Sequence, residues 1–154
     1  MSNNLILLQA SEDVRIYEKT NSFKIKLVLE DTTITAYDLK TNKEIGYISL
    51  REVQSGKAPY INIAYLLEYI STFPKDYRRN GIGESIIRMF IDCGISPIYA
   101  RNPFAQRSDL DDEDSSYLID VGPHFVIGLA KKGLLTYEDQ SDYSVMNEDA
   151  HIIN

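Results

Sequence analysis

The segment YRRNGIGESII, residues 77–87, places two arginines, an asparagine and two glycines directly before a helical pattern of apolar residues. Ile82, Ile86 and Phe90 recur at the spacing of one helix face, so a helix is predicted from Ile82 until Gly94 ends it. The start of a helix presents main-chain N–H groups and the positive end of its dipole, and both attract anions. Glycines there let a phosphate approach the backbone closely. The segment therefore predicts a phosphate-binding turn with arginine charge beside it.

Strands are predicted on both sides of this turn and helix. Before the turn, the β-rich segments are residues 23–30, 33–39, 44–52 and 60–73. The first of them alternates strictly, with Phe23, Ile25 and Leu27 on one face. After the helix, a strand, a second helix and two short strands are predicted at residues 96–101, 125–132, 134–137 and 143–146. A strand, a turn, a helix and another strand form a parallel crossover, so we expect an α/β fold with a mixed sheet and helices on its faces.

The composition of the 154-residue chain is that of a single globular domain, with 44% apolar and 25% charged residues. No apolar run has the length of a membrane span and no secretory signal is recognisable, so we expect a cytoplasmic protein without a membrane partner. The single cysteine, Cys93, is expected to be a buried thiol. The net charge of −7 argues against nucleic acid as a partner. His124 and His151 have no second ligand at metal spacing, so no metal site is predicted.

Three types of phosphate-binding turn compete for the glycine segment. A P-loop needs a glycine, then four residues, then Gly-Lys-Ser/Thr, and the chain has no such run. A dinucleotide-binding turn needs glycine or alanine where Ile86 stands, and an acidic residue on a second strand of an alternating fold. The third type is a pyrophosphate cradle formed by main-chain N–H groups. A purely structural turn is the alternative interpretation.

The hexapeptide RRNGIG, residues 78–83, resembles the Q/R-x-x-G-x-G/A motif of the GNAT superfamily of acetyl-CoA-dependent N-acetyltransferases. The longer stretch EYISTFPKDYRRNGIGESII is similar to that family's fourth strand, bulge, pyrophosphate loop and helix in order, and the resemblance covers residues 33–102. It implies one domain over residues 1–154, with a GNAT-like sheet that is antiparallel in its N-terminal part and splayed after the fourth strand. It also implies transfer of an acetyl group from acetyl-CoA to an amine by direct attack.

The resemblance also implies which residues hold acetyl-CoA. Main-chain groups at the end of the fourth strand would bind the pantetheine arm, those of Ile70, Ser71 and Thr72. The pyrophosphate would lie on main-chain amides of the turn, those of Arg79, Asn80, Gly81, Ile82 and Gly83. Side chains of Arg78 and Ser85 would add contacts, and the connection is one residue longer than usual, which allows a shift of the pantetheine register to Phe73. Asn102 would lie near the cofactor or act only as a strand-end turn residue.

The resemblance implies that Glu68 is the general base. Strand alternation puts it on the same face as Ile70, and in the family carboxylates on this face of the fourth strand reach the acceptor amine. The alternative is a glutamate that faces solvent. The tyrosine that serves as general acid in the family has no counterpart, since its position holds Leu129; the alternatives are Tyr99, Tyr117 and Tyr137.

Two further features bear on the acceptor and on the rival function. Five acidic residues between 109 and 114 favour a cationic amine acceptor, such as a polyamine, an aminoglycoside or a lysine-rich peptide, with plain solvated surface as the alternative. The family's two N-terminal helices have no room between Glu30 and Thr33. With the missing tyrosine, this favours the rival hypothesis, a non-catalytic domain of the same fold that binds CoA or a protein. The sequence leaves open whether the chain forms a homodimer.

Overall fold

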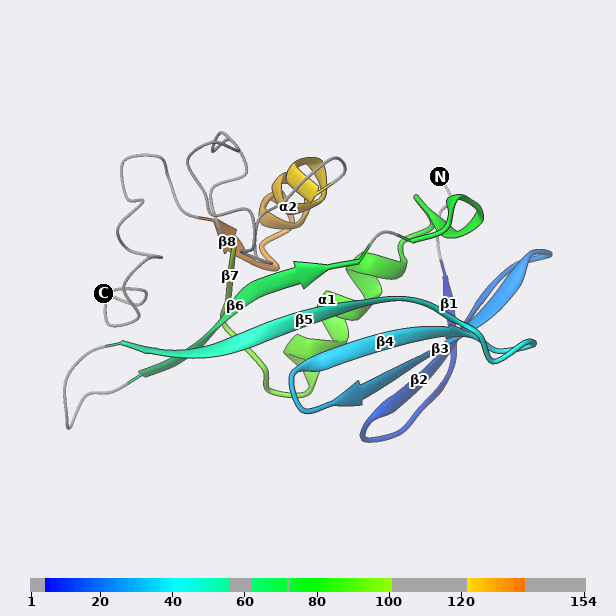
Figure 1. Ribbon diagram of the computed structural model, residues 1–154, viewed down its shortest axis with the longest axis horizontal. Coiled ribbons are helices and arrows are strands. Elements are labelled where there is room, and N and C mark those ends of the chain that lie inside the picture. Colours follow the sequence, from blue (N-terminus) through cyan, green and yellow to red (C-terminus); the bar gives the residue numbers. More distant parts are fainter. Residues whose placement is uncertain (1–4, 56–61, 72, 101–121, 138–154) are drawn as a thin grey trace. The chain divides into compact units, whose positions relative to one another are not determined.

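The computed structural model describes residues 5–55, 62–71, 73–100 and 122–137 (Figure 1). Within these ranges the chain forms β1 (Ile6–Ala10), β2 (Val14–Lys19), β3 (Phe23–Glu30), β4 (Thr33–Asp38), β5 (Glu44–Ser55), β6 (Asn62–Ile70), the 3-10 helix η1 (Lys75–Tyr77), α1 (Ile82–Asp92), β7 (Ile98–Ala100), α2 (Gly122–Lys131) and β8 (Thr136–Tyr137). The strands are hydrogen-bonded in sequence order, β1 to β8, in one sheet. The predicted α/β class with a mostly antiparallel sheet is confirmed.

The chain divides into two compact units, residues 1–49 with 71–94 and residues 50–70 with 95–154. β5 begins in the first unit and ends in the second. The prediction of one domain for the whole chain stays a prediction.

In the first unit, β1 to β5 form an antiparallel meander whose turns suit their residues. Asn21, Asp31 and Asn42 follow or precede the strand ends with φ of 58°, 58° and 62°. These left-handed conformations are tolerated best, after glycine, by asparagine and aspartate, whose short side chains bond the local backbone. The strands predicted at residues 23–30, 33–39 and 44–52 are confirmed as β3, β4 and β5.

The register of the meander defines the face that α1 covers. Arg15 lies opposite Leu27, and Leu27 lies opposite Ala36, so these side chains share one face of the sheet. Arg15 Nη2 contacts Asp92 Oδ2 in the last turn of α1 at 2.9 Å. α1 therefore packs on this face, where the apolar side chains of the strands are buried and meet the buried row of the helix, Ile82, Ile86, Ile87, Met89 and Phe90.

The N-terminal hairpin was not predicted. β1 pairs with β2, and β2 with β3, so the described residues upstream of β3 are strands rather than the two helices usual in the GNAT family. β1 is at the edge of the sheet, and its five residues are exposed, including Ile6, Leu7 and Leu8.

In the second unit, β6, β7 and β8 pair in parallel, as the predicted crossover requires. Tyr65 lies opposite Ile98 and Tyr99 lies opposite Thr136. Val53, Ala64 and Leu66 form a buried cluster here. The splay predicted after the fourth strand falls between β6 and β7 and stays a prediction. The strand predicted at 143–146 lies outside the described residues.

One prediction about the core is wrong. Cys93 is exposed rather than buried. It is the C-cap of α1, so it lies at the very end of the helix, where the cover that buries Ile86 and Phe90 ends. Neither α-helix in the described part of the chain is long and apolar enough to cross a membrane.

Candidate functional site

The chain leaves β6 through Ser71, which makes two bonds to the same residue of β5. The Ser71 main-chain N–H donates to the Tyr47 carbonyl at 3.0 Å, and the Tyr47 N–H donates to the Ser71 hydroxyl at 2.7 Å. The hydroxyl thus takes the place that a main-chain carbonyl would have in a regular ladder. Of the Ser71 groups predicted to hold a pantetheine arm, the N–H is already bonded, whereas the carbonyl lies outside this pair of bonds.

Two residues later, the ring of Phe73 lies directly over Gly46 of β5. A Cβ at Gly46 would be 2.6 Å from Cε1 of this ring, closer than real Cβ contacts come. Glycine is therefore needed at this position for the ring to approach the strand. The Phe73 carbonyl accepts a bond of 2.7 Å from Nε of Arg78, which joins the two ends of the connection.

The glycine turn has a special backbone at two of its residues. Arg79 has φ 61°, and Gly81, the N-cap of α1, has φ 85° and ψ 9°. A left-handed conformation is ordinary for glycine but uncommon for arginine, and such residues gather at functional sites. The side-chain amide of Asn80 donates to the Arg78 carbonyl at 3.0 Å, which holds the turn from within.

The first turn of α1 presents the amides expected of an anion site. The first i to i−4 bond runs from the Ser85 N–H to the Gly81 carbonyl at 3.0 Å. The amides of Ile82 and Gly83 precede it, at a helix start, where the first amides lack the i−4 carbonyls that the later ones bond. Arg78 and Arg79 are exposed beside them.

A carboxylate that sequence reasoning missed also lies in this turn. Glu84 accepts from Arg88 Nε at 2.9 Å, one helical turn further on. The sequence could have indicated this residue, because acidic residues in the first turn of a helix complement the helix dipole, and Glu84 lies in the first turn of the predicted helix.

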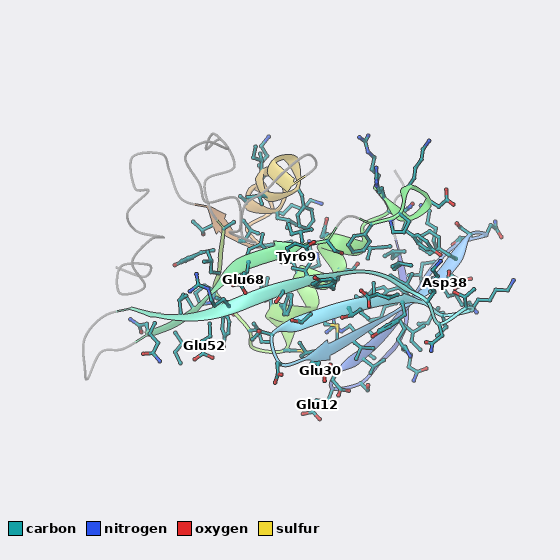
Figure 2. All side chains as sticks on the ribbon, viewed as in Figure 1. Glu12, Glu30, Asp38, Glu52, Glu68 and Tyr69 are labelled. Atoms are coloured by element: carbon teal, nitrogen blue, oxygen red, sulfur yellow. The ribbon has the colours of Figure 1, made fainter. Side chains whose placement is uncertain are left out.

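Tyr77, the last residue of η1, ties the turn to the end of β4. Its hydroxyl donates to Asp38 Oδ2 at 2.5 Å, and its ring centroid is 4.9 Å from that of Phe23. Figure 2 shows Asp38 at the end of β4, beside the turn into β5. The bond raises the pKa of Tyr77 to about 12, and it is the main reason that the pKa of Asp38 is lowered.

The predicted base, Glu68, lies in β6 in the second unit (Figure 2). Its Oε2 is 3.5 Å from Nε of Arg51 on β5, and 35% of its side chain is exposed. An ion pair this exposed contributes little to stability. Of its two neighbours in the strand, Leu67 is buried, whereas Tyr69 is 37% exposed.

The candidates for general acid are partly described. Leu129, at the family's tyrosine position, is buried in α2. Tyr99 is half-buried and packs against the Val53, Ala64 and Leu66 cluster. Tyr117, Thr72, Asn102 and the acidic segment at 109–114 lie outside the described residues, as does the side chain of Tyr137.

The residues predicted to bind the pyrophosphate all belong to the first unit, namely Arg78, Arg79, Asn80, Gly81, Ile82, Gly83 and Ser85. Ser71, predicted to bind the pantetheine arm, belongs to the same unit, whereas Ile70 and Glu68 belong to the second. Among the described side chains, no three of His, Cys, Asp or Glu gather closely enough to hold a metal ion. Comparisons with protein-family models, with curated proteins and with solved structures find no significant match.

Proposed function

We propose that this chain is a GNAT-like N-acetyltransferase, which binds acetyl-CoA at the glycine turn and transfers the acetyl group to an amine. The observation that carries the proposal is the left-handed backbone of Arg79 and Gly81 immediately before α1. This geometry would leave amides at the start of the helix available to an anion, and two exposed arginines precede them in the chain.

The turn suits a pyrophosphate in charge and in shape. Main-chain amides of residues 79–83 would bind the phosphate oxygens, and the helix dipole favours negative charge at this end. Arg78 uses Nε to hold the Phe73 carbonyl, so its two terminal nitrogens are the groups that would contact the phosphate. The Ser71 carbonyl would accept a bond from an amide of the pantetheine arm.

In the reaction that follows from this binding, the amine nitrogen attacks the thioester carbonyl carbon. The C–N bond would form, the C–S bond would break, and the CoA thiolate would leave and take up the proton that the nitrogen loses as it becomes an amide. Glu68 would remove the proton of the acceptor ammonium, and a main-chain N–H of β6 would stabilise the carbonyl oxygen. The acidic segment at 109–114 would favour a cationic acceptor.

A second candidate is a non-catalytic domain that binds CoA through the same turn. Two observations favour it: Leu129 is buried where the family has its acid, and Glu68 already has a cationic neighbour in Arg51.

The first test is a thermal-shift and calorimetric titration with CoA and acetyl-CoA. A ligand at about one hundred times its Kd should stabilise the native state by about 2.7 kcal/mol. Gly81→Asp should abolish this effect, because it adds a carboxylate and a Cβ where the phosphate would lie.

Gly94→Asp is the matched control. Gly94 has φ 84°, close to the 85° of Gly81, so the same substitution imposes the same backbone strain at the other end of α1, about 20 Å away. If Gly94→Asp binds CoA normally and Gly81→Asp does not, the turn is the site. If the wild-type protein binds neither ligand, the proposal is wrong. Release of free CoA with an amine panel then separates the enzyme from the binding domain.

A further inference from the structure

The connection between β6 and α1 is fastened to the strands of the first unit at successive points. Ser71 bonds to Tyr47, the Phe73 ring packs on Gly46, and the Tyr77 hydroxyl bonds to Asp38. The third of these contacts is closest to the glycine turn, because Tyr77 is two residues before the left-handed Arg79.

The Asp38 carboxylate is also fixed by contacts other than that with Tyr77. Its Oδ1 accepts from the main-chain N–H of Lys40 at 2.9 Å and from that of Thr41 at 3.0 Å, in the turn that joins β4 to β5. Its Oδ2 is the oxygen that Tyr77 contacts. An acceptor fixed by two main-chain donors gives the hydroxyl one well-defined position, and the Phe23 ring fixes the Tyr77 ring at 4.9 Å.

The turn needs such support because its conformation is intrinsically unfavourable. A non-glycine residue in the left-handed region costs roughly 1–2 kcal/mol, so Arg79 adopts it only where neighbouring contacts impose it. Asn80 supplies one such contact within the turn. Tyr77 supplies the contact to the sheet.

We propose that the Tyr77–Asp38 hydrogen bond is a positioning contact, which holds the glycine turn in the conformation that binds the pyrophosphate of CoA. This rests on the proposed function for its ligand. A ligand that binds only the ordered turn has its apparent affinity reduced by the fraction of molecules in which the turn is ordered. Tyr77 and Asp38 therefore act on CoA affinity without touching CoA.

The test uses Tyr77→Phe, which keeps the ring beside Phe23 and removes only the hydroxyl. A hydrogen bond of ordinary net strength corresponds to a change of about fivefold in a binding constant, so the CoA Kd should rise about fivefold or more. Asp38→Asn should weaken binding in the same direction, and adding it to Tyr77→Phe should bring little further loss, because both remove one contact. Tyr37→Phe, which removes a hydroxyl from the preceding residue of β4, is the control and should leave the Kd unchanged.

A second measurement, NMR order parameters of the main-chain amides at residues 78–83, is made without ligand. These should fall in Tyr77→Phe and stay at the wild-type value in Tyr37→Phe. If wild type and Tyr77→Phe bind CoA equally, with equal order in the turn, the positioning role is wrong. If the wild-type protein does not bind CoA, the proposed function fails, and the order parameters alone decide whether Tyr77 holds the turn. A lower melting temperature with unchanged affinity and order would make Tyr77 merely structural and overturn the proposal.

Discussion

Substituting Gly46 by alanine tests how the connection after β6 is seated on the sheet. The new Cβ would be 2.6 Å from Cε1, 2.7 Å from Cδ1 and 2.9 Å from Cζ of Phe73. An ordinary carbon–carbon contact is about 3.5–4.0 Å, so the ring would have to retreat by roughly 1 Å. Because three atoms of the ring are too close, rotating the ring about its own axis does not relieve the overlap.

Two opposing effects set the magnitude. Overpacking costs typically about 1–3 kcal/mol, and the lower part of this range applies because Phe73 is only half-buried and can move outward. Replacing glycine by alanine inside a strand gains roughly 0.5–1 kcal/mol of backbone entropy. We therefore expect a net loss of about 1 kcal/mol in the free energy of unfolding, measured by urea denaturation, with a melting temperature about 2–4 °C lower.

In a protein that already carries Phe73→Ala, the expected effect of Gly46→Ala on the free energy of unfolding changes sign. Without the ring there is no overlap, so Gly46→Ala should then be neutral or should stabilise the protein by up to about 1 kcal/mol. If Gly46→Ala is equally harmless with and without the Phe73 ring, the ring does not rest on this glycine. The single variant should also weaken CoA binding, because the displaced residue carries the carbonyl that Arg78 holds.

Three further predictions concern the turn, the base and the pH dependence of stability. Arg78→Glu should weaken CoA binding less than Gly81→Asp does, because salt screens an exposed charge. Calorimetry at low and high salt measures this effect. An unchanged CoA affinity at low salt would show that the Arg78 guanidinium does not contact the ligand. Glu68→Gln should lower turnover by roughly a hundredfold or more and leave CoA affinity unchanged. It should also remove the acidic limb of the pH–rate profile. A wild-type rate in this variant would show that Glu68 is not the base. The Tyr77–Asp38 bond should stabilise the fold most at intermediate pH. Its contribution is lost as pH rises through the pKa of Tyr77, about 12, and as pH falls through the lowered pKa of Asp38. Urea midpoints of wild type and Tyr77→Phe should then converge at both extremes, and a constant difference across pH would contradict the coupling.

Local periodicity was enough to predict the central elements. Alternating apolar residues in β3 and an apolar row at helical spacing in α1 each reflect one buried face, and a buried face imposes its period on the sequence directly. β1 shows why the hairpin before them was not predicted. Its residues are exposed and carry no alternation, so it is a strand because β2 pairs with it, and pairing between strands leaves no local signal.

The glycine turn could also be predicted from local sequence, because single residues such as glycine allow the backbone conformation that the turn needs. Gly81 at φ 85° is a local demand that glycine meets. The contacts that support the turn could not be predicted in this way. Tyr77 and Asp38 are 39 residues apart, and Arg51 meets Glu68 only through the register of two strands. Neither pair has a spacing that a helix or a strand would repeat.

The supporting contacts also decide how a ligand would be bound at the turn. A loop that must be ordered on binding loses roughly 1–2 kcal/mol of backbone entropy for each residue fixed, and this reduces the affinity. Here Ser71, Phe73 and Tyr77 fix the connection at intervals of two and four residues, and Asn80 fixes the turn itself. Most of that ordering is therefore done when the first unit folds. It follows that affinity at the turn should respond to substitutions in β4 and β5, at Asp38 and Gly46, although neither residue belongs to the turn.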